Sequence, residues 1–176
     1  AEPKINFISS GDEKARESLS VLKKKYKHYK LKDANLIVVL GGDGTILSSL
    51  HKNYMKKIPI YGMNRGNIGF LMNNYSIDDL EKRLRKSIPT KLFPLKIKTF
   101  SKEGVETELL AFNEVSLIRD SHQSAKIKID VNGVTKIEEL QCDGCLISTP
   151  AGSSAYNLSL RGPVVPIGAK ILALTP

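Results

Sequence analysis

The residues with the clearest chemical meaning are a carboxylate set among three glycines, Gly41-Gly42-Asp43-Gly44-Thr45. The apolar run 36–40 precedes them and Ile46-Leu47-Ser48-Ser49-Leu50 follows, which predicts a strand, a turn and a helix in that order. In such a turn, backbone N–H groups and the N-terminus of the helix approach a phosphate closely. A carboxylate beside a phosphate binds a metal or accepts a proton, so the turn predicts phosphoryl transfer. The alternative is that Asp43 only caps the helix.

A second glycine-spaced turn follows the next expected strand, at residues 62–71. It offers the amides of Asn64 and Asn67 and the guanidinium of Arg65, which suit a charged nucleotide. Its glycines do not match the G-x-G-x-x-G fingerprint of dinucleotide-binding folds. Because it follows the neighbouring strand, we expect it to face the same crevice as the first turn.

Two further polar segments lie in the second half of the chain. The pair Asn113-Glu114 marks either the end of a strand or a site that holds the hydroxyls of a sugar. Residues 148–156, Ser-Thr-Pro-Ala-Gly-Ser-Ser-Ala-Tyr, are small and hydroxylated, but they lack the lysine of a P-loop. No histidine or lysine stands ready to activate Ser153 or Ser154, so a binding loop is favoured over a nucleophile.

The two cysteines are expected to pack as small apolar residues rather than to bind a metal. Cys142 and Cys145 form a lone C-x-x-C inside an expected strand, and a metal site would need two more soft ligands. The three histidines, His28, His51 and His122, are scattered along the chain. We therefore expect no metal site and read the cysteines as small buried apolar residues.

These motifs need a scaffold, and residues 4–90 alternate between strand and helix patterns. Strands are expected at 4–8, 36–40 and 58–63, and helices at 12–27 and 45–54. Ser76-x-x-Asp79 resembles a capping box that opens a third helix. This order predicts a parallel sheet with helices on its faces and with ligands at the carboxyl ends of its strands.

The pattern changes after Pro89, where short strand-like segments take over. Asn132-Gly133, between two of these segments, is the sequence signature of a β-hairpin. The chain is therefore expected to contain an α/β domain over residues 1–92 and an antiparallel β-rich domain over residues 93–176. The expected strands of the second domain are 95–100, 106–117, 125–131, 134–140 and 146–148.

A net charge of +9 favours anionic partners. The basic run at 23–32 is read as a solvated helix end, since no nucleic-acid signature accompanies it. The longest apolar run, at 36–40, is too short to span a membrane, and the first residues do not resemble a signal peptide. We therefore expect a cytoplasmic protein that binds neither nucleic acid nor membrane.

The motifs taken together closely resemble those of NAD kinases, in order and with similar spacing from about residue 36 onward. The Gly-Gly-Asp-Gly turn alone is shared with diacylglycerol and sphingosine kinases and with phosphofructokinases. The Asn-Glu pair and the Ser-Thr-Pro-x-Gly-Ser-x-Ala-Tyr segment together are far more specific. The residues that carry the resemblance are 41–45, 64–71, 113–115, 143–144 and 148–156.

The resemblance implies transfer of the γ-phosphoryl group of ATP, or of inorganic polyphosphate, to the adenosine-ribose 2′-hydroxyl of NAD, giving NADP. Asp43 would accept the hydroxyl proton. Mg²⁺ is expected to arrive with ATP rather than to sit in a protein cage. The turn around the phosphates would be shaped by Gly41, Gly42, Gly44 and Thr45.

The resemblance also implies a dinucleotide pocket and an assembly. Asn113 and Glu114 would hold the dinucleotide, and Asp143 would be a nicotinamide-side carboxylate contributed across a subunit contact. Family members are homodimers or homotetramers with a Rossmann-like half and a β-rich, sandwich-like half. The adenosine pocket would be covered by Phe70 and Leu71 and lined by Ser154, Ala155, Tyr156, Asn157, Leu158 and Ser159.

The sequence departs from the family pattern at four positions and in length. Arg161 stands where a glycine is usual, and Asn73, Gln141 and Cys142 also differ from the common residues. The sequence stops at residue 176, where relatives continue with further strands, so we expect a truncated β-rich half. Two alternatives stay open: a lipid kinase of the diacylglycerol type, and a non-catalytic nucleotide-binding fragment.

Overall fold

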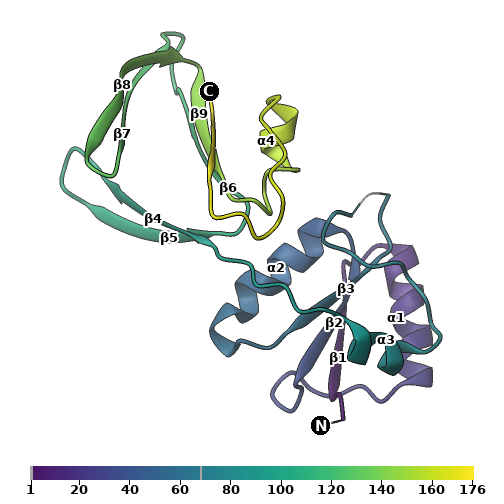
Figure 1. Cartoon of the computed structure of the whole chain (residues 1–176). Coiled ribbons are helices and arrows are strands. Elements are labelled where there is room, and N and C mark those ends of the chain that lie inside the picture. The colour runs from purple at the N-terminus through teal and green to yellow at the C-terminus, as the bar shows by residue number, and fades with distance from the viewer. Residues whose placement is uncertain (1, 68) are drawn as a thin grey trace. The chain divides into compact units, whose positions relative to one another are not determined.

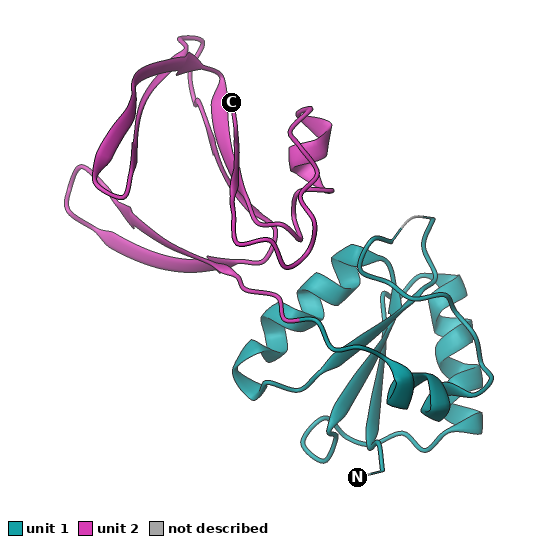
Figure 2. Cartoon of the chain, in the orientation of Figure 1, with its two compact units in different colours: residues 1–90 teal, residues 91–176 magenta. Residues whose placement is uncertain are grey.

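The computed structural model describes residues 2–67 and 69–176, and the chain divides into two compact units. Unit 1 comprises residues 1–90 and unit 2 residues 91–176 (Figure 2). The units therefore meet two residues before the boundary expected from the sequence. No helix in the described part of the chain is long and apolar enough to cross a membrane.

Unit 1 is built on a three-stranded parallel sheet, as the alternating pattern predicts. Its strands are β1 (Ile5–Ser9), β2 (Leu36–Gly41) and β3 (Ile60–Asn64), with β2 in the centre. Ile37, Val38, Val39 and Leu40 of β2 are all fully buried, because both faces of the central strand are covered. Helices α1 and α3 lie on one side of this sheet and α2 on the other (Figure 1).

The helices follow the apolar pattern, with one correction at a helix start. Helix α1 (Glu13–Lys25) is capped by Asp12, whose side chain accepts from the N–H of Ala15 at 2.9 Å. Helix α2 (Asp43–Asn53) begins inside the glycine-rich turn and continues into a 3₁₀ turn, η1 (Tyr54–Lys56).

The predicted capping box at residues 76–79 is wrong. Helix α3 (Leu80–Lys86) begins only after it, and Asp79 makes no side-chain capping bond. The Ser76 hydroxyl instead accepts from the N–H of Asp78 at 3.2 Å. Asp79 adopts a left-handed backbone with φ 53°, outside the extended region of a usual N-cap. The Ser76 hydroxyl is therefore engaged in a local turn and does not cap helix α3.

The carboxyl ends of β2 and β3 lie side by side, which brings the two glycine turns together. Gly41 is the register partner of Asn64, and the N–H of Arg65 donates to the carbonyl of Gly41 at 2.8 Å. After the second turn the chain returns to β3, since the N–H of Asn64 donates to the carbonyl of Asn73 at 2.8 Å. The expectation that both turns share one edge of the sheet is thus confirmed.

Unit 2 consists of antiparallel pairings. Strands β10 (Ala173–Thr175), β9 (Gly144–Ser148) and β6 (Glu114–Ile118) form one sheet in that order. Two hairpins accompany it: β4 (Leu95–Phe100) with β5 (Glu106–Ala111), and β7 (Ala125–Val131) with β8 (Val134–Cys142). A short helix, α4 (Tyr156–Ser159), follows β9 after the serine-rich segment (Figure 1).

Asn132-Gly133 forms the predicted hairpin turn, whereas the long strand predicted at 106–117 is wrong. Asn132 and Gly133 have φ 52° and 77°, the positive values that a type I′ turn requires. Between β5 and β6 the chain leaves one ladder and enters another, so the expected strand is two strands in different sheets. The break falls at Asn113, whose carbonyl accepts from the N–H of Thr149 at 2.8 Å.

Candidate active site

The Asp43 carboxylate is held in a fixed position, and it does not cap helix α2. One oxygen accepts from the N–H of Phe70 at 2.8 Å and the other from the N–H of Leu71 at 2.9 Å. Gly42 is the N-cap residue, and no side-chain capping bond is formed there. The capping interpretation of Asp43 is therefore wrong: its carboxylate joins the first glycine turn to the second.

The glycines are needed where other atoms come close. A methyl group at Gly41 would stand 2.5 Å from the hydroxyl of Thr45 and 3.0 Å from Cβ of Ser10. A methyl group at Gly69 would meet Met72 at 2.8 Å and an oxygen of Asp43 at 3.4 Å. Small residues thus let the two turns close around the carboxylate.

Met72 and Arg83, which no sequence motif marks, hold the second turn in place. Met72 fills the space beside Gly62 and Gly69, where an added methyl group would meet it at 2.3 and 2.8 Å. Arg83 of α3 donates to the carbonyl oxygens of Asn74 and Ser76, the latter at 3.2 Å. The arginine-rich end of α3 reads as surface in the sequence, and only the fold brings one of these side chains to the turn.

In unit 2, the side chains of Asn113 and Glu114 present acceptor atoms without a partner. Asn113 Oδ1 and Glu114 Oε2 are both buried, and neither accepts a hydrogen bond from the residues that the structure describes. Burial raises the pKa of the Glu114 carboxyl above its ordinary value. Buried polar atoms are normally paired, so this pair calls for a ligand that donates hydrogen bonds. Hydroxyl groups are such donors.

The serine-rich segment folds directly onto the Asn-Glu pair. Glu114 stands opposite Ser148 in the β6–β9 ladder. The Thr149 hydroxyl donates to the carbonyl of Phe112 at 2.7 Å and accepts from the N–H of Gly152 at 3.0 Å. A methyl group at Gly152 would stand 2.2 Å from the backbone oxygen of Asn113. The two motifs, 35 residues apart in sequence (113 to 148), form one surface.

The segment's members differ in what they can contact. Ser153 is fully buried and its hydroxyl bonds the backbone of Pro150 and Val165, which agrees with the rejection of a nucleophile. Asn157 is also fully buried, with its amide bonded to Pro163 and Thr175. Its side chain therefore packs the interior. Ser154 and Ala155 are half-buried, and the exposed members are Tyr156, Leu158 and Ser159.

Asp143 is exposed and already paired. Its carboxylate forms an ion pair with Arg119, with Nε and Oδ1 2.7 Å apart. The backbone N–H of Arg119 also donates to the carbonyl of Asp143 at 3.0 Å. Asp143 and Tyr156 line one cavity of about 340 Å³ in unit 2. Two of the predicted substrate-binding residues therefore line the same cavity.

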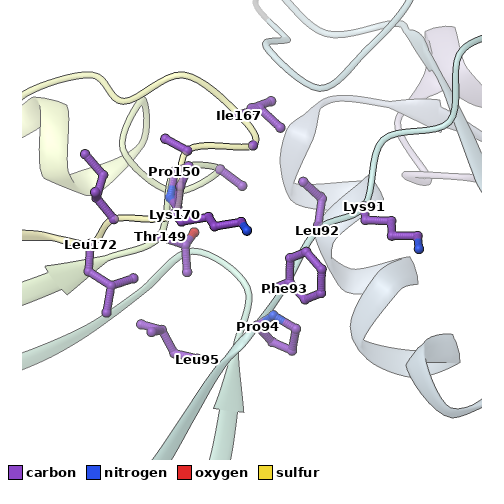
Figure 3. A pocket seen from close by; sticks show the side chains of 14 residues that line it. Lys91, Leu92, Phe93, Pro94, Leu95, Thr149, Pro150, Ile167, Lys170 and Leu172 are labelled. Atoms are coloured by element: carbon purple, nitrogen blue, oxygen red, sulfur yellow. The ribbon is translucent and has the colours of Figure 1, made fainter.

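A larger and more apolar cavity, of about 420 Å³, lies elsewhere in unit 2 (Figure 3). Two chain segments and part of the serine-rich segment form its wall. None of the predicted substrate-binding residues lines it, which sets it apart from the site. The lining residues are Lys91, Leu92, Phe93, Pro94, Leu95, Thr149, Pro150, Ala151, Ile167, Gly168, Ala169, Lys170, Ile171 and Leu172.

Cys145 takes the packing role expected of it, whereas Cys142 is only half-buried. Cys145 is buried, and this burial, with Cys142 adding to it, raises the pKa of its thiol. A raised pKa keeps the thiol protonated and unreactive. In the part of the chain that the structure describes, no group of three His, Cys, Asp or Glu residues could hold a metal ion.

A parallel sheet whose strand end carries a glycine-rich turn and a fixed carboxylate fits a nucleotide-dependent phosphotransferase. Two family models match the chain: the ATP-NAD kinase N-terminal domain over residues 7–91 and the ATP-NAD kinase C-terminal domain over residues 112–176. The chain belongs to the ATP-NAD kinase family.

Individual relatives agree with the family models. The chain is 47% identical over 176 residues to the NAD kinase of Xylella fastidiosa (strain Temecula1), covering all of this chain and 68% of that one. It is 45% identical over 173 residues to the NAD kinase of Hyphomonas neptunium, covering 98% and 68%. The chain thus spans about two thirds of the length of these relatives.

Solved structures show the same fold. An NAD kinase from Archaeoglobus fulgidus in complex with ATP matches with a TM-score of 0.70 and 28% identity, covering 98% of this chain and 71% of that one. Yeast NADH kinase complexed with NADH matches with a TM-score of 0.73 and 20% identity, covering 99% and 66%. The family models and these relatives give no support to the lipid-kinase alternative.

Proposed function

We propose that this protein transfers the γ-phosphoryl group of ATP, or of inorganic polyphosphate, to the adenosine-ribose 2′-hydroxyl of NAD. The observation that carries the proposal is the Asp43 carboxylate, fixed by two backbone N–H groups at a glycine-rich strand end. The unpaired acceptors of Asn113 and Glu114 support it from unit 2, since a ribose offers hydroxyl donors to both.

Asp43 is proposed as the proton acceptor. The N–H groups of Phe70 and Leu71 occupy one lone pair on each carboxylate oxygen and leave others free for a hydroxyl proton. In the loose transition state of phosphoryl transfer, bond making to the attacking oxygen lags, so the proton leaves late. A carboxylate in a fixed orientation therefore serves as acceptor, and alignment supplies most of the catalysis.

The phosphates of the donor are proposed to lie over Gly41, Gly42, Gly44 and Thr45. The N-terminus of α2 gives this turn backbone N–H groups and a positive dipole end. Asp43 is the sole acidic residue of the turn, and one carboxylate supplies fewer oxygen ligands than Mg²⁺ requires. Mg²⁺ is therefore proposed to arrive on the polyphosphate with its own waters, where it neutralises charge.

The dinucleotide is proposed to occupy the surface formed by the Asn-Glu pair and the serine-rich segment. Asn113 and Glu114 would bind its sugar hydroxyls, and Tyr156 would contact the adenosine from the wall of the smaller cavity. Phe70, a residue that is 59% exposed, and Leu71 are proposed to cover the adenosine. Contacts from the segment would come from Ser154, Ala155, Leu158 and Ser159 and from the backbone of Asn157.

Assembly as a homodimer or homotetramer in the cytoplasm is also proposed. Unit 2 exposes large apolar side chains on its strands, including Leu117 at 57% and Ile118 at 69%. Apolar surface of this kind is typical of protein–protein contacts. Asp143, at the rim of the smaller cavity, would then serve the nicotinamide side of a neighbouring subunit's site. Light scattering during gel filtration measures the mass and tests the assembly.

The proposed reaction is tested by incubating the protein with NAD, ATP and Mg²⁺ and detecting NADP with an NADP-specific dehydrogenase. That enzyme reports the 2′-phosphate itself. Replacing ATP by polyphosphate and NAD by NADH in parallel reactions defines the donor and the acceptor. Formation of NADP supports the proposal. Binding of NAD in calorimetry without NADP formation would favour the non-catalytic alternative.

A further inference from the structure

A guanidinium without a counter-ion lies in the second glycine turn of unit 1. The backbone of Arg65 is tied to the first turn, since its N–H donates to the carbonyl of Gly41 at 2.8 Å. The next residue packs against that turn as well: a methyl group at Gly66 would stand 3.7 Å from Cα of Gly42. Arg65 is thus anchored directly beside the proposed phosphate-binding turn.

The side chain of Arg65 is held in place but not neutralised. Its guanidinium carbon lies 4.1 Å from the centre of the Tyr75 ring. Its Nε is buried and makes no hydrogen bond. Within residues 2–67 and 69–176, Arg65 forms no ion pair, and its guanidinium donates no hydrogen bond. A buried Nε without a hydrogen-bond acceptor costs free energy, and an anion bound by the guanidinium would supply that acceptor.

The other half-buried arginines do not share this state. Arg83 donates to two backbone carbonyl groups, and Arg119 forms an ion pair with Asp143. Arg65 shares their partial burial, but within the described residues its guanidinium has neither a hydrogen-bond acceptor nor an ion-pair partner. A purely structural arginine would be expected to bond as Arg83 does.

Charge balance in the turns points the same way. Asp43 places a negative charge where the donor's phosphates are proposed to lie, and residues 41–45 contain no basic side chain to offset it. Arg65 is the basic residue among residues 62–71. A guanidinium presents a planar fork of donors that matches two oxygens of a phosphate. Its positive charge also favours the charge that develops on the transferring group.

We propose that Arg65 binds the phosphate oxygens of the phosphoryl donor, with the Tyr75 ring holding the guanidinium flat. The proposal rests on the proposed function for the identity of the anion. The recognised chemistry is a polyphosphate chain, which ATP and inorganic polyphosphate share. Arg65 would be a binding residue for the donor and not for NAD.

The direct test measures binding without turnover. Calorimetry compares Mg²⁺-tripolyphosphate and Mg²⁺-ATP on the wild-type protein, Arg65→Gln, Arg65→Lys and the control Arg85→Gln. Arg85 is an exposed residue of α3, so the control removes the same charge from unit 1 away from the turns. We expect Arg65→Gln to weaken both ligands by about tenfold to a hundredfold. Arg65→Lys should retain part of the affinity, because it keeps the charge but not the fork. The control should bind both ligands as the wild type does.

Steady-state kinetics give the second readout. In Arg65→Gln, the KM for ATP is expected to rise about tenfold or more, with the KM for NAD within about twofold of the wild-type value. Thermal unfolding of each variant separates loss of the Tyr75 contact from loss of ligand binding. A lower unfolding temperature with unchanged ligand affinity would assign Arg65 to packing and overturn the proposal.

Three other results would also overturn it. The first is equal tripolyphosphate affinity in Arg65→Gln and the wild type. The second is no tripolyphosphate binding by the wild type, and the third is a loss of affinity for ATP alone. The last would place the guanidinium on the nucleoside rather than on phosphate. If tripolyphosphate binds in an Arg65-dependent manner but no NADP forms, the proposed function fails and this inference stands.

Discussion

The two units position their candidate residues by different physical means. In unit 1, the central strand is fully buried from Ile37 to Leu40, and helices α1 and α3 complete an apolar cluster against the sheet. In unit 2, the strands expose large apolar side chains, and Leu146 is among the few that are fully buried. The serine-rich segment is held there by hydrogen bonds to backbone and by close backbone contact at Gly152.

The difference teaches which part of the site is set by packing and which by polar contacts. The Asp43 turn stands at the end of a strand that the core fixes, and two backbone hydrogen bonds hold its carboxylate. The acceptor atoms of Asn113 and Glu114 are buried and have no hydrogen-bond partner among the described residues. A ligand that donates hydrogen bonds would therefore stabilise them on binding. We therefore expect substitution of Asp43 in unit 1 to change turnover most, and substitutions at the Asn113-Glu114 surface of unit 2 to change NAD binding and stability.

The largest effect is expected from Asp43→Asn. The amide cannot accept the hydroxyl proton, and its NH₂ would face a backbone N–H where an oxygen now accepts. We expect turnover to fall by about 10²–10⁴-fold, as for the loss of a general base. NADP formation and thermal unfolding are measured together, with the exposed Asp33→Asn as a control of equal charge change. Turnover within about threefold of the wild type would contradict the role of Asp43.

A smaller effect, on stability and NAD binding, is expected from Gly152→Ala. The added methyl group would stand 2.2 Å from the carbonyl oxygen of Asn113, and backbone cannot move aside as a flexible side chain can. We expect unit 2 to lose about 1–3 kcal/mol of stability and the NAD affinity to weaken. Urea unfolding and NAD calorimetry measure the two effects.

The matched change in unit 1 is Gly44→Ala, which sharpens the comparison. No atom lies within 4 Å of the added methyl group there, and Gly44 is inside helix α2. Its unfolding free energy should stay equal or rise by up to about 1 kcal/mol, since alanine favours the helix. Equal destabilisation by both substitutions would show that the close contact at Gly152 does not determine the outcome.

Much of unit 1 follows from the sequence because its signals are local. Leu36–Gly41 is a continuous apolar run before glycines, and Asp12 precedes an amphipathic helix, so strand and cap are both predictable. The side-chain bonds of Asp43 are not local, because Phe70 and Leu71 are brought to it only by the pairing of β2 and β3. That is why a capping role for Asp43 stayed open in the sequence.

In unit 2, the sequence indicates which residues form a turn or a binding segment, but not how the strands around them pair. Asn132-Gly133 predicts its hairpin because the turn needs positive φ at both residues. The break at Asn113 leaves no local signal, since residues 106–117 alternate plausibly as one strand and only the pairing with β9 divides them. The interior role of Asn157 is hidden for the same reason: its partners at Pro163 and Thr175 come from the fold.

A third prediction concerns the pH dependence of stability. Burial raises the pKa of the Glu114 carboxyl above its ordinary value of 4.5, so between pH 4.5 and the pKa of the folded state the folded protein keeps a proton that the unfolded chain has lost. The stability from this group is complete below 4.5 and is lost as the pH rises through the folded pKa. In Glu114→Gln this loss of stability with rising pH should be absent. Urea unfolding from about pH 4 to pH 8 should give a flatter profile for the variant.

Ligand binding should show the opposite trend for the same group. The ionised carboxylate accepts hydrogen bonds more strongly than the protonated one, so the NAD affinity of the wild type should rise as Glu114 ionises. Glu114→Gln should bind NAD more weakly, with little change over this pH range. Parallel stability profiles in both proteins, or equal pH dependence of NAD affinity, would show that Glu114 is not the titrating group.

The smallest effect is expected at Arg161, which follows α4. Arg161 has a left-handed backbone with φ 63°, and its N–H donates to the carbonyl of Leu158 at 2.9 Å. A side chain in this conformation costs about 1–2 kcal/mol. Arg161→Gly removes that cost but gives the unfolded chain more freedom, so we expect a net gain of about 0.5 kcal/mol in the free energy of unfolding. Arg161→Ala keeps the strained Cβ and serves as the control. A gain of equal size in Arg161→Ala would assign the effect to the lost charge rather than to the backbone.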